Sequence, residues 1–340
     1  MSVKERQDPV LVLCDREEEY AQLMTEFLHR HREVPWKVHT YTDVKELMDG
    51  EGDGQSDVLL ISERTYHEDV LRLHTKRMVI LRENGVLEAD KYTFIDKYQQ
   101  AMDVLQQLLE LYLEVADITI PGGMRRGKQK LLGIYSPVRR CRQTTFALSL
   151  AQMLAENHRT LYLNFEHYVG ISELCADVGG RDLADLLYFL MTDDDKFAIR
   201  FHTMVKHLGN LDYVPPMKSG QNMLFVQAKE WMKLFQRIEQ LDDYEIIILD
   251  LSESMQGLFD LLRMCDKVFT LTGEDRVAQG KLAEYERLLD AYEYGDVLQK
   301  TRKCRMPKVR RIPDSLEEYT RGEVADFVKR MIRELEVDTE

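Results

Sequence analysis

Residues 136–145, Ser-Pro-Val-Arg-Arg-Cys-Arg-Gln-Thr-Thr, carry the side chains of this sequence best suited to binding an anion. They follow a short apolar run and precede a segment rich in Ala and Leu, a pattern that predicts a loop between a strand and a helix. The first amides of that helix, at Thr144, and the arginines Arg139, Arg140 and Arg142 would all attract a phosphate group. Alternatively, these arginines form ion pairs with acidic groups of a partner or of this protein.

The loop lies in a series of apolar runs that alternate with helical periods, the pattern of a parallel sheet wrapped by helices. The expected strands of this half are LLGIYS, TLYLNF, LDYVPP, YEIIILD, KVFTLT and a last strand KVRRIP. The expected helices include residues 144–157, 221–240, 255–264, 275–292 and 315–335. The run EIIILDL is continuously apolar, which is typical of a strand buried on both faces.

The first part of the chain shows a similar alternation. Its expected strands are PVLVLCD, WKVHTYT, DVLLIS, RMVILRE and YTFIDKY, and its expected helices are residues 17–30, 43–48 and 99–116. Residues 117–130 combine one Pro, three Gly and four basic residues without a core pattern, so we interpret them as a linker. The prediction is two doubly wound α/β domains, residues 1–116 and residues 131–340.

Composition and charge exclude several classes of ligand and cellular location. The 340 residues include 46 Lys and Arg against 60 Asp and Glu, and the net charge of −14 opposes general binding to nucleic acid or anionic lipid. The N-terminus lacks the pattern of a signal peptide and no apolar run approaches the length of a membrane span, so we expect a cytoplasmic protein. The five cysteines form no CxxC pair, and we expect no zinc, haem or flavin.

Residues 133–155 resemble the P-loop of the MinD/ParA class of ATPases, in which Ser-Pro precedes Lys-Gly-Gly-x-Gly-Lys-Thr-Thr. The chain keeps the two ends of this pattern, Ser136-Pro137 and Thr144-Thr145. Its middle is replaced, with Val138 at the first lysine, Arg139, Arg140 and Arg142 at the glycines, and Gln143 at the second lysine. The resemblance implies a nucleotide site made of these residues.

The replacements weaken the expected chemistry. A glycine of a phosphate-binding loop often takes a positive φ, which a residue with a Cβ adopts at a cost of about 1 kcal/mol. Gln143 is neutral, and Val138 cannot reach across a dimer to stabilise developing charge. We therefore expect little or no ATP hydrolysis, whereas binding of ATP remains open.

The resemblance also assigns roles further along the chain. Glu166 follows TLYLNF, where the class positions the attacking water. Asp250 ends the strand that matches the Walker B strand and would bind Mg²⁺ through water, with Thr144 as a second Mg²⁺ residue. A buried strand end also needs a polar residue, so a purely structural role for Asp250 is an equal alternative.

The first domain resembles the receiver domain of response regulators. An active receiver has an acidic pair after the first strand, a phosphoacceptor aspartate after the third, Ser or Thr after the fourth and Lys after the fifth. Only Asp15 and Lys97 match, because Ser62 replaces the phosphoacceptor and Arg82 or Glu83 follows the fourth strand. A serine cannot form an acyl phosphate, so we expect no phosphotransfer. We expect Asp15 and Lys97 to be solvated charges.

A degenerate receiver followed by a MinD/ParA-like domain resembles the TadZ/CpaE family over essentially the whole chain. The resemblance implies a cytoplasmic homodimer, polar or peripheral to the inner face of the membrane, that works with cytoplasmic pilus proteins to localise and assemble a Flp/Tad pilus machine. Two alternatives stay open. One is an active Mg-ATP-dependent dimerisation switch, and the other is a ParA/MinD-like partition or positioning protein.

Overall fold

The computed structural model divides the chain into two compact units. The first contains Met1–Ile120 and Asp193–Thr203, and the second contains Pro121–Thr192 and Met204–Glu340. The first unit therefore includes a segment from the second half of the sequence, which the boundaries expected from the sequence do not foresee. Within these units the structure describes residues 9–31, 34–52, 54–83, 85, 87, 92–113, 129–170, 180–192, 196–309 and 315–337. Residues 117–128 of the expected linker lie outside the described residues.

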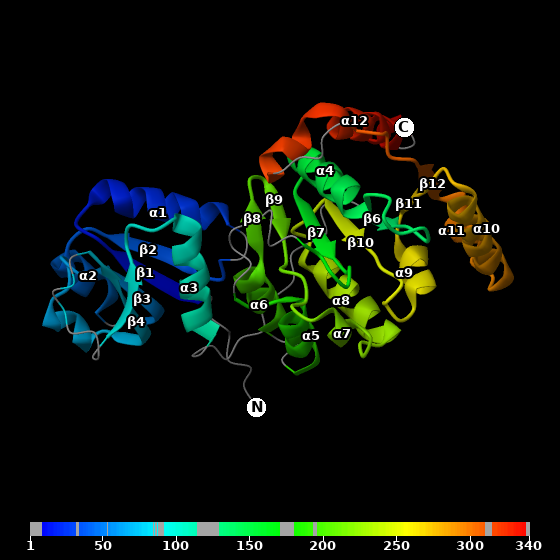
Figure 1. Ribbon diagram of the computed structural model, residues 1–340. Helices are drawn as coiled ribbons and strands as arrows, with labels where there is room; N and C mark the ends of the chain where they lie inside the picture. Colours follow the sequence, from blue (N-terminus) through cyan, green and yellow to red (C-terminus); the bar gives the residue numbers. More distant parts are fainter. Residues whose placement is uncertain are drawn as a thin grey trace. The chain divides into compact units, whose positions relative to one another are not determined.

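The first unit is built on a five-stranded parallel sheet in the order β2-β1-β3-β4-β5 (Figure 1). This order is the flavodoxin-like arrangement, and receiver domains share it. The central strands β1 and β3 coincide with the apolar runs of the sequence, because a strand covered on both faces buries every side chain. The strands are β1 (Val10–Cys14), β2 (Lys37–Tyr41), β3 (Gln55–Ser62), β4 (His74–Arg82) and β5 (Thr93–Asp96).

Helices cover both faces of this sheet. α1 (Glu18–Arg30) and α3 (Ala101–Leu113) share one core with alternate residues of the strands, and Ile199 of α6 (Phe197–Met204) is fully buried in the same core. α2 (Val44–Glu51) and the 3₁₀ helix η1 (Glu68–Arg72) cover the other face. The connection between β3 and β4, whose residues the structure describes in full, contains only this 3₁₀ helix.

The second unit has a seven-stranded sheet in the order β12-β11-β6-β10-β7-β9-β8. All neighbouring strands are parallel except β8, which is antiparallel to β9. The carboxyl ends of β6, β7 and β10 therefore meet at one edge, where the candidate residues follow the strands. The strands are β6 (Lys130–Tyr135), β7 (Thr160–Asn164), β8 (Lys206–Leu208), β9 (Leu211–Tyr213), β10 (Ile246–Asp250), β11 (Lys267–Leu271) and β12 (Thr301–Cys304).

α4 (Gln143–Ala155) and α12 (Gly322–Val337) pack together on one face of this sheet, and Figure 1 shows α8 (Ala228–Leu241) and α9 (Leu258–Met264) on the opposite face. The shorter connections include α5 (Leu183–Thr192), α7 (Gly220–Met223) and α11 (Gly295–Gln299), and α10 (Arg276–Ala291) follows β11. The structure describes no helix that is long and apolar enough to cross a membrane.

Several element boundaries differ from the sequence expectations. The sequence did not predict β12 (Thr301–Cys304), because an edge strand with one buried side chain, Cys304, has no apolar run to reveal it. Residues 310–313 of the expected last strand KVRRIP lie outside the described residues. The expected helix 221–240 is two helices, and the second starts at a capping box between Gln227 and Glu230. The expected helix 315–335 begins as a 3₁₀ turn, η4 (Leu316–Thr320), and becomes α12 at Gly322.

Candidate functional site

The loop between β6 and α4 keeps the backbone of a glycine-rich loop without the glycines. Arg139, Arg140 and Arg142 have φ angles of 60°, 51° and 64°, in the left-handed region. These are the three positions at which the MinD/ParA pattern has glycine. Each non-glycine residue in this region costs roughly 1 kcal/mol, so the surrounding structure holds the loop against its own preference.

Ser136 fixes the start of this loop. Its hydroxyl donates a hydrogen bond to the Leu271 carbonyl at 2.7 Å and accepts one from the Val138 N–H at 3.1 Å. The side chain is buried, so it ties the end of β6 to the end of the neighbouring strand β11. Pro137 continues the loop. The Ser136-Pro137 start of the loop thus has a structural role that needs no nucleotide.

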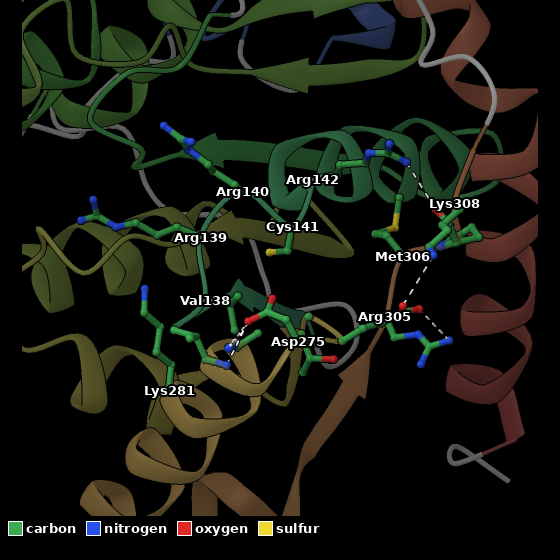
Figure 2. A pocket seen from close by; sticks show the side chains of 16 residues that line it. Val138, Arg139, Arg140, Cys141, Arg142, Asp275, Lys281, Arg305, Met306 and Lys308 are labelled. Carbon is green, nitrogen blue, oxygen red and sulfur yellow. Dashed lines mark hydrogen bonds and ion pairs between the residues drawn. The ribbon is translucent and has the colours of Figure 1, made fainter.

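The three arginines leave the loop in different directions (Figure 2). Arg139 forms an ion pair with Glu253, and Arg142 donates to the Pro307 carbonyl at 3.2 Å. Arg140 is exposed and makes no hydrogen bond or ion pair with any residue that the structure describes. The alternative that the arginines pair within this protein is therefore realised for Arg139, whereas Arg140 has no acidic partner among the described residues.

Gln143, at the position of the P-loop lysine, points inward to the end of β10. Its amide nitrogen donates to Asp250 Oδ1 at 2.6 Å and to the Leu251 carbonyl at 2.8 Å, and lies 3.3 Å from Glu166 Oε1. The side chain is buried at the first residue of α4. It joins the loop, β10 and the residue after β7 into one polar cluster.

Asp250 is fully buried at the centre of this cluster. Its Oδ2 accepts hydrogen bonds from the Tyr162 hydroxyl at 2.9 Å and from the Asn164 amide at 3.1 Å. Burial raises the pKa of Asp250 to about 6, although hydrogen bonds from Gln143, Tyr162 and Thr144 oppose this rise. Since both oxygens already have protein donors, the residues present do not fit a hydrated Mg²⁺ ion at this carboxylate.

The wider surroundings offer no replacement ligand set. Among the described residues, no group of three or more His, Cys, Asp or Glu side chains could hold a metal ion. Thr144, the second residue predicted to bind Mg²⁺, hydrogen bonds to Asp250, and Thr145 follows it in the first turn of α4. The two residues predicted to bind Mg²⁺, Thr144 and Asp250, thus lie together, but they hydrogen bond to each other.

Glu166 lies beside this cluster and stays partly accessible. Burial, followed by the charge of Asp250, raises the pKa of Glu166 to about 7, and Arg139 opposes the rise. Glu166 lines a hollow of about 410 Å³ at the ends of β6, β7 and β10, together with Ser136, Arg139, Arg140 and Gln143. A carboxyl group with this pKa can hold or release a proton near neutral pH.

Sequence reasoning missed two members of this site. Tyr162 lies two residues before Asn164 on β7, so the alternation of a strand places both on one face, and Asn164 is the register partner of Asp250. Glu253 follows Asp250 by three residues and pairs with Arg139. The strand period was a usable signal for Tyr162, whereas nothing in the sequence links Glu253 to Arg139.

The candidate residues of the first unit form a closed ionic cluster. The Lys97 ammonium lies 2.8 Å from Asp15 Oδ2, 3.2 Å from Glu83 Oε1 and 3.4 Å from Glu17 Oε1, and the Lys97 side chain has no exposed surface. The expectation that Asp15 and Lys97 are solvated was wrong, because both residues are buried, and Tyr20 of α1 lies over the Lys97 ammonium. Burial lowers the pKa of Lys97, but Asp15 and then Glu83 outweigh this and raise it.

Ser62 lies apart from these ion pairs, and its hydroxyl shares a hydrogen bond of 2.7 Å with Thr65. The next residue, Glu63, accepts backbone N–H groups of Glu83, Gly85 and Leu87 at 2.9 to 3.0 Å. These bonds fix the loop that carries Glu83 after β4. Sequence reasoning missed Glu63, although an acidic residue directly after a buried strand was a visible signal.

The sequence matches no protein-family model and no curated protein sequence. Solved structures similar to part of this chain include the following three. A ParA family ATPase from Chlorobium tepidum has 15% identity and a TM-score of 0.47, covering 59% of this chain and 97% of its own. A plasmid partition protein from Borrelia burgdorferi has 14% identity and a TM-score of 0.41, covering 61% and 100%. The MinC:MinD cell division complex of Aquifex aeolicus has 15% identity and a TM-score of 0.40, covering 59% and 78%.

Proposed function

We propose that the second unit is a P-loop domain that does not hydrolyse ATP, and that the protein acts as a TadZ/CpaE-like scaffold. The observation that carries the proposal is that the Gln143 amide donates hydrogen bonds to the Asp250 carboxylate and to the Leu251 carbonyl. A hydrolytic P-loop needs a lysine on the transferring phosphate and Mg²⁺ held near the Walker B aspartate. Gln143 supplies no charge, and Asp250 has no free oxygen.

The first unit supports the same conclusion. A receiver that passes a phosphoryl group needs an acceptor carboxylate and a free lysine, but here Ser62 stands at the acceptor position and three carboxylates surround Lys97. Each unit thus has the sheet and loops of an enzyme fold but lacks residues that its reaction would need. We infer that the protein works through contacts, as a homodimer in the cytoplasm that positions and helps to assemble a Flp/Tad-type pilus machine.

Exposed aromatic side chains supply a surface for such contacts. Tyr168 is 90% exposed and lines the 410 Å³ hollow, and Phe225 is 80% exposed next to the half-exposed Leu224. Gly220, at the start of α7, packs against the backbone of His167, so the segments that carry these residues are neighbours. Aromatic side chains of this kind are typical of protein interfaces.

The first test is titration calorimetry of the full chain with ATP and Mg²⁺, combined with a phosphate-release assay. We expect no Mg²⁺-dependent binding and no release above buffer. A positive control replaces residues 138–143 by Lys-Gly-Gly-Cys-Gly-Lys. Mg²⁺-dependent ATP binding by the natural sequence, lost on Asp250→Ala and coupled to a change of dimer population in light scattering, would show an active switch instead.

The cellular role needs a separate test. In cells that carry the natural gene, a fluorescent fusion should form discrete foci, and deletion should remove surface pili. Restoration of pili by an Asp250→Ala gene would agree with a scaffold that needs no Mg²⁺. Normal pili after deletion, with defective plasmid or chromosome partition, would support the positioning protein of the ParA/MinD type.

A further inference from the structure

The chain passes between the two units more than once. It enters the second unit at Pro121, returns to the first for Asp193–Thr203 and re-enters the second at Met204. The structure describes residues 196–203 of the returning part, and most of them form α6. We call residues 196–203 the inserted segment. A simple linker would cross once, so the first unit incorporates a piece of chain whose neighbours in the sequence belong to the second.

The inserted segment is part of the core of the first unit. Ile199 has no exposed surface and belongs to the cluster that contains Leu28 of α1 and Leu108 of α3. The Lys196 ammonium donates a hydrogen bond of 3.4 Å to the carbonyl of Leu113, the last residue of α3. A cation at the C-terminus of a helix interacts favourably with the free carbonyls there. An apolar contact and a polar contact thus attach the inserted segment to the first unit.

At its other end the inserted segment continues almost directly into the sheet of the second unit. A single residue, the buried Val205, separates α6 from β8, which is an edge strand of the seven-stranded sheet. β8 pairs with β9 in antiparallel register, and His207 lies 2.6 Å from Asp212 across this pair. One residue spans at most about 3.6 Å of chain. A larger displacement of α6 therefore has to disturb β8.

α6 is too short to be stable without packing on its sides. It has eight residues, whereas isolated helices shorter than about 12 residues are marginal in water. The face opposite Ile199 carries Phe197 and Phe201, which are fully buried and stacked with their ring centroids 6.1 Å apart. The helix therefore forms only where the surrounding chain covers both of its faces.

We propose that the inserted segment couples the two units, so that a change of stability in one unit is transmitted to the other. Unfolding of the second unit releases both ends of α6, and the first unit then loses Ile199 from its core. Conversely, a partner that binds and stabilises the first unit holds α6, and thereby β8, in place. A coupling free energy between two parts of a protein is reciprocal. The inference goes beyond the proposed function and does not depend on it.

A double-mutant cycle on the full chain tests the proposal. Leu150→Ala destabilises the second unit from its own core, where Leu150 has no exposed surface. Trp36, in the same core as Ile199, reports the first unit in a Trp231→Phe background. We expect Leu150→Ala to lower the urea midpoint of the Trp36 signal in the otherwise natural chain. In an Ile199→Ala background, the same change should shift this midpoint by less than about half as much.

The matched control is Ile95→Ala. Ile95 is the same residue type, is buried in the same core and lies on β5, outside the inserted segment. Ile95→Ala should lower the Trp36 midpoint but leave the effect of Leu150→Ala on that midpoint unchanged. An absent Trp36 shift in the otherwise natural chain would overturn the coupling. Shifts of equal size in the Ile199→Ala and Ile95→Ala backgrounds would overturn its assignment to α6.

Hydrogen exchange gives a second measurement that does not require unfolding of either unit. In Ile199→Ala, the amides of β8 and β9 should exchange at least about tenfold faster than in the natural chain, because α6 no longer holds β8. Ile95→Ala should leave their exchange unchanged. Equal exchange in all three chains would overturn the inference and leave the scaffold intact. Hydrolysis of ATP, in contrast, would contradict the proposed function and leave this inference intact.

Discussion

The Lys97 cluster of the first unit and the arginine loop of the second, residues 138–142, both lie at the carboxyl ends of parallel strands, but the charges of the two are compensated differently. Lys97 has no exposed surface and meets three carboxylates at 2.8, 3.2 and 3.4 Å. Arg140 and Lys281 are exposed, and the described residues give them no ion pair. A buried charge must be matched inside the protein, whereas an exposed excess of charge can be matched by a ligand.

The two sites show how burial decides what a charged side chain can do. In the first unit, Glu83 lies 3.2 Å from the Lys97 ammonium and adds a second buried carboxylate to that of Asp15. Arg64 pairs with Glu83 in turn, at 2.9 Å. In the second unit the arginines of the β6–α4 loop lie at the surface, where Arg140 has no acidic partner among the described residues.

The largest expected effect is on the closed cluster. Lys97→Met leaves Asp15 buried without its cation and leaves Glu83 with Arg64 alone, which should lower the free energy of unfolding by about 3–5 kcal/mol. Trp36 lies in the core of the first unit, and the chain has one further tryptophan, Trp231, in the second. Urea unfolding followed by Trp36 fluorescence in a Trp231→Phe background therefore reports this unit.

The control is Lys76→Met, in the same unit. Lys76 pairs with Asp57 at 2.7 Å but its side chain is half exposed, so the loss should stay below about 1 kcal/mol. Equal losses for the two variants would remove the distinction between a closed cluster and a surface ion pair.

The next effect is on Gln143. Gln143→Leu removes the donor to Asp250 and to the Leu251 carbonyl, which should cost about 1–3 kcal/mol. The loss should be greater at pH 8 than at pH 5, because the Asp250 carboxylate, with a pKa of about 6, is ionised at the higher pH. Trp231 fluorescence in a Trp36→Phe background measures it. The exposed Gln236→Leu on α8 should change little, and a pH-independent loss would contradict this role for Asp250.

Substitution of Glu166 should stabilise the second unit at high pH, whereas substitution of Gln143 should destabilise it. Its pKa in the folded protein is about 7, above the usual 4.5, so the stability it contributes is complete below pH 4.5 and is lost as the pH rises through 7. Glu166→Gln should therefore stabilise the second unit by about 1–2 kcal/mol at pH 8 and by much less at pH 5. Melting temperatures across this range test it, with the exposed Glu284→Gln as control. A gain that is constant with pH would refute the raised pKa.

The smallest effect is on the strained loop. Arg140→Gly relieves a φ of 51° at a side chain that has no partner among the described residues, and should stabilise the protein by about 0.5 kcal/mol after the entropy of glycine is subtracted. The same change in a helix, Arg287→Gly in α10, should destabilise by about 1 kcal/mol. Differential scanning calorimetry compares the two. Destabilisation by both would mean that the loop does not hold Arg140 against its preference.

Much of the fold follows from local pattern. The apolar runs at residues 10–14, 58–61 and 246–249 predicted buried parallel strands, and β1, β3 and β10 include them. Strand β12, and the burial of helix α6 in the core of the first unit, could not be foreseen in the same way. Thr301–Cys304 buries one side chain at a sheet edge, and Ile199 is buried in the core of the first unit, far from it in sequence. Local periodicity carries no information on such distant partners.

The sequence by itself determined which residues meet at the β6–α4 loop and that a charged lysine and three glycines are missing there. Only the tertiary structure decided what replaced them. In the folded protein Gln143 donates a hydrogen bond to Asp250, and Lys97 is buried among carboxylates. Arg140 and Lys281 instead line a hollow and stay exposed. Residue type and spacing fix charge and backbone preference, whereas burial and pairing depend on which distant segments pack around each group.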